Sequence, residues 1–99
     1  IEFHDLLYRA ARNSRLVGII SNLREQLTRF RTLSMSYSGR LETTLEEHRE
    51  IVEAIAEGDV KRAKKAAEHH MEMSEKTLLK AVDANKKNEK TKRARKAAK

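Results

Sequence analysis

The sequence predicts an all-α protein, an antiparallel helical bundle in which four helices are visible. Two observations support this prediction. The 99 residues include no proline, only three glycines, two phenylalanines and two tyrosines, whereas a β-sandwich or barrel needs frequent turns and aromatic or β-branched strands. Apolar side chains also recur at spacings of three and four residues, the repeat of one face of an α-helix.

The first two expected helices fill the N-terminal third of the chain. The first spans about residues 2–12 and ends at Asn13-Ser14, where Asn tolerates a left-handed turn and Ser can cap the next helix. The second spans about residues 15–36. Its apolar stripe consists of Leu16, Ile20, Leu23, Leu27 and Phe30.

The third and fourth helices follow the loop at residues 34–40. The third ends near Glu57, before Gly58, and Asp59 is placed to cap the fourth, which spans Val60 to about Asn85. The expected inward face of the third helix is Leu41, Leu45, His48, Ile51, Val52 and Ile55. The expected inward residues of the fourth are Val60, Ala63, Ala67, His70, Met71, Ser74 and Leu78. Because the loops are short, neighbouring helices should be antiparallel.

The charge of the chain is concentrated at its C-terminal end. The net charge is +7, yet residues 1–79 carry equal numbers of basic and acidic side chains, so the whole excess lies in residues 80–99. We therefore divide the chain into a helical domain, 1–83, and a basic tail, 84–99, expected to be frayed or disordered. The alternative for the tail is a salt-dependent, sequence-indifferent contact with nucleic acid or an acidic partner.

The composition limits the location of the protein and the chemistry open to it. Without cysteine there are no disulfides, thiolate metal sites or cysteine nucleophiles. No apolar run approaches the roughly 20 residues of a membrane span, and no signal-peptide pattern occurs, so we expect a cytoplasmic protein without a membrane partner. No nucleophile elbow or glycine-rich phosphate loop is present, so we expect no enzyme. Glu46, Glu47, Glu50 and Glu53 are interpreted as a solvated helix face.

Three of the four histidines are predicted to point into one interior. His48 shares a face with Ile51 and Val52, and His70 lies on the small-residue face of the last helix. His4 shares a face with Leu7 and Tyr8, whereas His69 is turned about 100° away from its neighbour and is expected outside. Three imidazoles on separate helices suit a divalent transition metal, zinc first, with nickel, manganese or iron as alternatives. The alternative is that each is a hydrogen-bonded core histidine.

Several segments together resemble a known family. Phe3-His4, the stretch 10–16 (Ala-Ala-Arg-Asn-Ser-Arg-Leu), Glu47-His48-Arg49-Glu50-Ile51, the stretch 54–59 (Ala-Ile-Ala-Glu-Gly-Asp) and His70-Met71 occur in order. This pattern, over about residues 1–79, resembles the C-terminal effector-binding (FCD) domain of FadR-type regulators in the GntR family of bacterial transcription factors.

The resemblance implies a metal site and an effector. In the metal-binding branch of the family, an aspartate and three histidines hold a divalent metal, and the three histidines match His4, His48 and His70. The aspartate would stand four residues before the first histidine, a position that precedes Ile1. The resemblance further implies a small organic acid beside the metal. Arg31 is our candidate for pairing with its carboxylate.

The beginning of the chain and its size add an expectation about assembly. The chain begins in mid-helix without a cap, and about 80 structured residues are few for a self-sufficient core. We expect a fragment that lacks its first helices, a homodimer that completes the core, and DNA binding only through an N-terminal winged helix-turn-helix absent from this chain. The alternative function is a metal-free helical dimerisation or interaction module.

Overall fold

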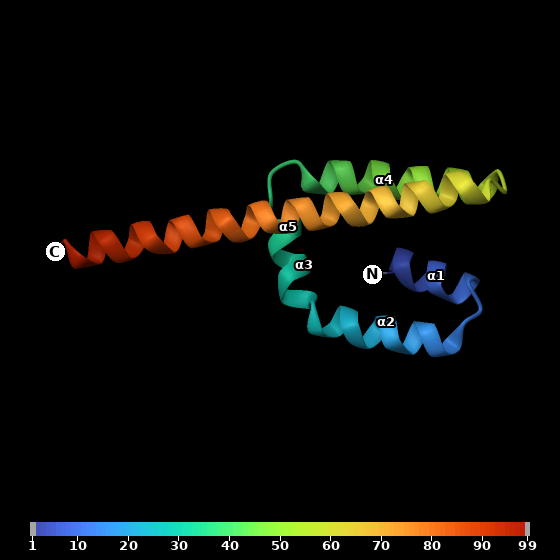
Figure 1. The fold of residues 1–99 in the computed structure, drawn as a ribbon, viewed down its shortest axis with the longest axis horizontal. Helices are drawn as coiled ribbons and strands as arrows, with labels where there is room; N and C mark the ends of the chain where they lie inside the picture. The colour runs from blue at the N-terminus through green and yellow to red at the C-terminus, as the bar shows by residue number, and fades with distance from the viewer. Residues whose placement is uncertain (1, 99) are drawn as a thin grey trace.

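The computed structural model describes residues 2–98, and the chain is all-α there. Five helices, rather than the four expected, follow one another (Figure 1): α1 Glu2–Ala10, α2 Ser14–Gln26, α3 Thr28–Met35, α4 Arg40–Ala56 and α5 Val60–Ala97. Two antiparallel pairs, α1 with α2 and α4 with α5, are joined by α3, which packs against α5. The position expected for the ligating aspartate lies outside the described residues.

The turn between α1 and α2 differs in detail from the prediction. Arg12, not Asn13, takes the left-handed conformation, with φ 53°. Asn13, not Ser14, caps α2, because its side chain accepts a hydrogen bond of 3.0 Å from the backbone N–H of Leu16. Asparagine is among the best N-cap residues, since its side-chain oxygen satisfies an otherwise unpaired helix donor.

The single helix expected over residues 15–36 is divided at Leu27, whose backbone leaves helical geometry at φ −94° and ψ 4°. Two threonines, Thr28 and Thr32, follow this break. Thr28 Oγ1 donates to the Arg24 carbonyl at 3.1 Å, and Thr32 Oγ1 donates to the Thr28 carbonyl at 3.0 Å. Such hydroxyl bonds to the preceding turn bend helices, which apolar periodicity alone does not reveal.

The α4–α5 hairpin follows the prediction closely at its turn. Gly58 takes a left-handed φ of 70°, and Asp59 Oδ1 accepts a 3.0 Å hydrogen bond from the backbone N–H of Arg62. At its other end α5 continues past the expected end near Asn85 to Ala97, as a lone exposed helix beyond α4 (Figure 1). The expected end of the last helix near Asn85 is therefore wrong, while the division into a domain (1–83) and a frayed or disordered tail (84–99) stays a prediction.

The buried face of α4 lies one residue before the predicted one. Its members are spaced by four and three residues: Arg40, Thr44, Glu47, Ile51 and Ala54. α4 packs against α5, and α5 also contacts α3. The buried residues of α5 are small or polar, namely Ala66, His70, Thr77 and Ala81. Four residues of the predicted α4 face are more than half exposed instead: Leu41, Leu45, Val52 and Ile55. Val60 and Met71 of the predicted α5 face are exposed as well.

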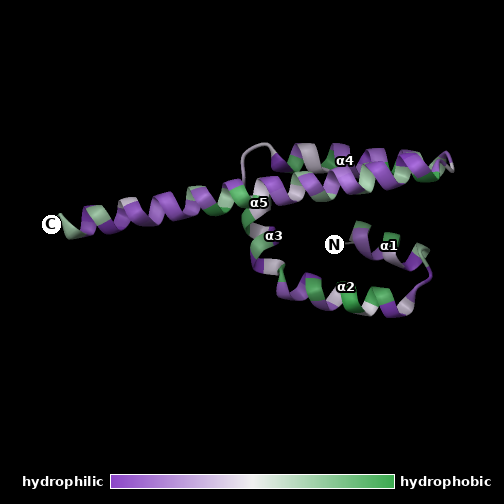
Figure 2. Cartoon of the chain, in the orientation of Figure 1, coloured by the Kyte–Doolittle hydropathy of each residue, from purple (hydrophilic) through white to green (hydrophobic). Residues whose placement is uncertain are grey.

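Much apolar surface of the described chain remains open. The stripe predicted on α2 contains no buried residue, and the apolar segments of this helix are visible in Figure 2. The radius of gyration is 17.3 Å, whereas a compact domain of 100 residues has about 13 Å. No helix among residues 2–98 combines the length and apolar character needed to cross a membrane.

Candidate metal centre

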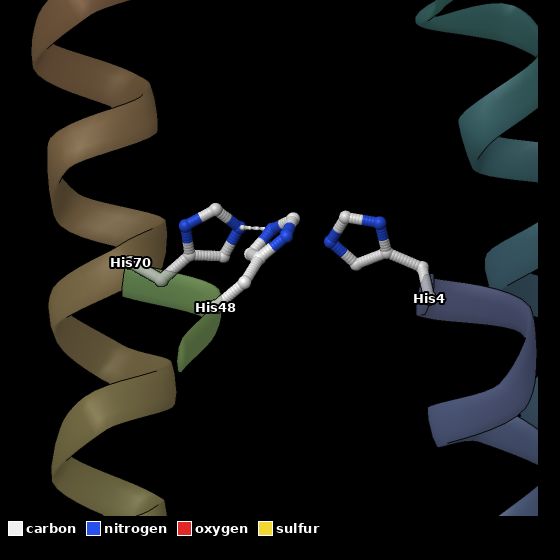
Figure 3. Close-up of side chains that lie close together, drawn as sticks. All are labelled: His4, His48 and His70. Carbon is white, nitrogen blue, oxygen red and sulfur yellow. Dashed lines mark hydrogen bonds between the residues drawn. The ribbon is translucent and has the colours of Figure 1, made fainter. Parts of the chain in front are cut away.

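The three histidines predicted to converge do so in the structure. His4 from α1, His48 from α4 and His70 from α5 each direct a ring nitrogen toward a common point, and these atoms lie within 4.8 Å of one another (Figure 3). His70 is buried, and the other two are partly buried. His69 is exposed on α5 and takes no part in this cluster, as expected from its position one residue away.

The spacing of the ring nitrogens suits a shared ion. Nε2 of His48 and Nε2 of His70 are 3.3 Å apart. A Zn–N bond is about 2.0–2.1 Å, so neighbouring nitrogens of a tetrahedral site stand about 3.4 Å apart. The His48–His70 pair already has this spacing, whereas the His4 nitrogen, within 4.8 Å of the other two, has to move inward to close the set.

Phe3 covers one side of the cluster. Its ring stacks on the imidazole of His48 at 4.1 Å between centroids, with 9° between the planes. The His4 ring meets that of His48 edge-on at 4.9 Å. These contacts come from neighbouring positions of α1, so the first turn of this helix both supplies a nitrogen and shields the cluster from water.

A buried network behind His70 was not predicted from the sequence. Glu47, which was expected on a solvated helix face, is only 7% exposed. Its Oε1 accepts a hydrogen bond of 2.7 Å from His70 Nδ1, and its two oxygens accept hydrogen bonds of 2.8 and 2.9 Å from Arg40. Arg40 also donates to Ser74 Oγ at 3.0 Å. The available signal was the spacing of Glu47, four residues before Ile51, which places both on one helix face.

The electrostatics favour the neutral imidazole at two members of the cluster, His4 and His48. Burial, and then the positive charge of Arg24, lowers the pKa of His4 from 6.5 to about 4. Burial and the neighbouring His70 lower the pKa of His48. Burial opposes ionisation of Glu47, but hydrogen bonds from Arg40 and His70 outweigh it and lower the pKa of this carboxyl. The lowered pKa values of His4 and His48 favour the neutral rings that can ligate a metal, and the lowered pKa of Glu47 favours an ionised carboxylate beside them.

Acid is expected to destabilise the metal-free protein through His4. Between pH 6.5 and about 4 the unfolded chain holds a proton on this side chain and the folded chain does not. Because the unfolded state binds more protons in this window, the free energy of unfolding falls as the pH drops through it. Melting followed by circular dichroism should show a shallower decline for His4→Gln than for the unchanged chain. Equal slopes would contradict this origin.

Two arginines, Arg24 and Arg31, lie close enough to His4 for their charges to act on its imidazole. Arg31, the predicted carboxylate partner, is half-buried on α3, and burial and the charge of Arg24 lower its pKa. Arg24, which was not predicted from the sequence, donates through Nη1 to Asp5 at 3.2 Å, and its guanidinium lies over the Tyr8 ring at 5.7 Å. Among the described residues, Arg24 Nη2 and His4 Nδ1 are buried without a hydrogen-bond partner. This niche has more cationic than anionic groups.

An all-helical fold with an imidazole cluster, bordered by a buried arginine nitrogen without a hydrogen-bond partner among the described residues, defines a small domain suited to binding a ligand. Residues 1–73 match the family model of the FCD domain, and the chain belongs to this family. FCD domains are effector-binding domains of GntR-type transcription regulators. Neither the curated proteins nor the solved structures contain a significant match.

Proposed function

We propose that the chain is the ligand-sensing domain of a FadR-type GntR transcription regulator, which binds a divalent metal ion and a small organic acid. In this function, His4, His48 and His70 hold the ion, zinc in the first place. One observation carries the proposal: three nitrogens from three separate helices lie within 4.8 Å of one another. The domain would act in the cytoplasm as part of a homodimer, with DNA bound through a winged helix-turn-helix domain outside this chain.

The metal site suits a sensor because it joins elements that otherwise touch little. His4 lies on α1, whereas His48 and His70 lie on the α4–α5 pair. A bound ion would supply open coordination positions, which a carboxylate oxygen can fill. An effector can shift the equilibrium between two arrangements of these helices only by the difference in its affinity for them. A ligand seated between α1 and the α4–α5 pair has that property, because it contacts both parts.

The cationic niche supports a carboxylate as the effector group. Arg24 keeps one buried N–H donor without an acceptor, and leaving such a donor unsatisfied costs free energy that a ligand can recover. Arg31 adds a second guanidinium close enough to interact with Arg24. A carboxylate placed beside His4 would accept from Arg24 and reduce the repulsion between the two cations. We therefore place Arg24 next to Arg31 as an effector-binding candidate.

Calorimetric titration tests the effector. Zinc-loaded protein is titrated with a panel of dicarboxylates and hydroxy acids, and at least one should bind. Arg24→Met should then weaken that acid by about 10-fold or more, because a charge-assisted hydrogen bond is worth about 1.5–3 kcal/mol. Arg29→Met, at an exposed position of α3, is the matched control and should bind normally. If zinc saturates the protein and no acid binds, the effector half of the proposal is wrong.

The exposed apolar stripes favour the alternative, a metal-free helical interaction module. Leu41, Leu45, Val52 and Ile55 recur along one exposed face of α4, and exposed apolar patches of this kind mark interaction sites. On this view the histidines are interface or core residues without an ion. Loss of the His48 imidazole separates the two functions, because only the sensor loses a bound metal.

A further inference from the structure

The three clustered histidines differ in what holds their second ring nitrogen. His70 Nδ1 lies 2.7 Å from Glu47 Oε1, whereas His4 Nδ1 is buried without a partner among the described residues. In the metal centre proposed above, on which this inference rests, a ligating histidine has to present an unprotonated nitrogen to the ion. The group that bonds the second ring nitrogen therefore influences which nitrogen is free of a proton and able to bind the ion.

Glu47 determines which His70 nitrogen is unprotonated. An ionised carboxylate only accepts hydrogen bonds, so the short contact requires the proton on His70 Nδ1. In the neutral ring the other nitrogen, Nε2, then carries the lone pair. This Nε2 is the atom that faces the cluster, 3.3 Å from Nε2 of His48.

Glu47 is itself held in place from the opposite side. Arg40 is 3% exposed and donates one hydrogen bond to each oxygen of the carboxylate. Arg40 also donates to Ser74 Oγ, and the Ser74 hydroxyl donates to the backbone carbonyl of His70 at 2.8 Å. The chain of bonds thus returns to the residue where it began, and it leaves Glu47 little freedom to turn away from His70.

We propose that Glu47 is a positioning residue of the metal centre. It holds His70 in the tautomer whose Nε2 lone pair faces the cluster, and Arg40 keeps the carboxylate in that orientation. Carboxylates behind ligating histidines fix ring orientation and raise ligand basicity, and their loss costs about 10–100-fold in metal affinity.

The first test compares zinc affinity between two neighbouring glutamates. Zinc is titrated in competition with a chromophoric chelator into the unchanged chain, Glu47→Gln and Glu46→Gln. Glu47→Gln should raise the Kd for zinc by about 10–100-fold. Glu46 is exposed one residue earlier on α4 and contacts neither His70 nor Arg40 through a hydrogen bond, so its variant should bind zinc like the unchanged chain.

The second test measures the tautomer of His70 directly. It uses a double variant, so that no buried charge is left without its partner. Arg40→Met/Glu47→Leu removes both charges together, which buried ion pairs often tolerate. In the metal-free proteins above the ordinary histidine pKa, nitrogen NMR of the imidazole rings should show His70 protonated at Nδ1 in the unchanged chain. In the double variant a larger share of the neutral His70 rings should be protonated at Nε2, and the affinity of the protein for zinc should fall.

Three outcomes would overturn the proposal. Wild-type zinc affinity in both variants would make Glu47 a purely structural residue, and the proposed metal centre would remain. Weaker zinc binding with an unchanged His70 tautomer would trace the loss to loosened packing. An unchanged chain that binds no zinc would overturn the metal centre itself, and the positioning role with it.

Discussion

Replacing Arg40 by methionine is expected to lower the free energy of unfolding by about 3–5 kcal/mol, because it leaves the Glu47 carboxylate buried without its main partner. The side chains of this ion pair are 3% and 6% exposed, and three hydrogen bonds depend on the guanidinium. Domains of this kind are stable by only about 5–15 kcal/mol. Chemical denaturation of the metal-free protein, followed by circular dichroism, measures the loss.

Two further variants test whether the loss of stability in Arg40→Met comes from the buried unpaired charge rather than from lost contacts in general. Arg40→Met/Glu47→Leu removes the unpaired charge and should recover a large part of the stability. Arg62 also bonds carboxylates, those of Glu50 and Glu57, but its partners are about half exposed or more. Arg62→Met should therefore destabilise the chain much less. Equal losses for Arg40→Met and Arg62→Met would contradict the argument.

Replacing His48 by glutamine is expected to abolish specific zinc binding. His48 lies between the other two rings, with 4.9 Å to His4 and 4.7 Å to His70 between centroids. Losing a direct ligand should cost more than about 100-fold in affinity, the upper end of the range for outer-shell partners. The unchanged chain at a zinc concentration of about 100 times Kd should gain about 2.7 kcal/mol of stability. The variant should gain almost none.

His69→Gln is the matched control for this measurement. His69 neighbours His70 in the chain but is exposed and outside the cluster, so its variant should retain one zinc ion and the accompanying rise in melting temperature. Metal content by mass spectrometry, together with melting curves with and without chelator, records both. Unaltered zinc content in His48→Gln would support the interaction module instead of the sensor.

The histidines of the candidate site could be predicted from the sequence more fully than the residues around them. Histidine is rare in the chain, and the helix face on which each one lies follows from counting residues. Placing His4, His48 and His70 on inward faces of separate helices required only the helical repeat, and the structure brings the three together. Arg31 was predicted near the site and lies close to Arg24 there. Arg24 was not predicted because its guanidinium contacts Asp5 and Tyr8, which lie on a different helix.

Glu47 shows most clearly what the helical repeat cannot decide. Two stripes run along α4 with the same spacing, one through Leu41 and Leu45 and the other through Arg40 and Glu47. Hydropathy favours the leucine stripe, yet α5 packs against the polar one. The polar stripe is tolerated inside because Arg40, Glu47 and His70 satisfy one another there, and burial of charge is acceptable only with such partners.

The sequence alone determined the all-α class, the turn at Gly58, the cap at Asp59 and the phase of the three histidines. Each of these follows from residues close together in the chain, through local propensity and the helical repeat. Only the tertiary structure decided which face of α4 meets α5, where Glu47 and Arg40 lie, and which donor of Arg24 stays unpaired. These features depend on side chains from different helices meeting in space, and their energies exist only once the helices have packed.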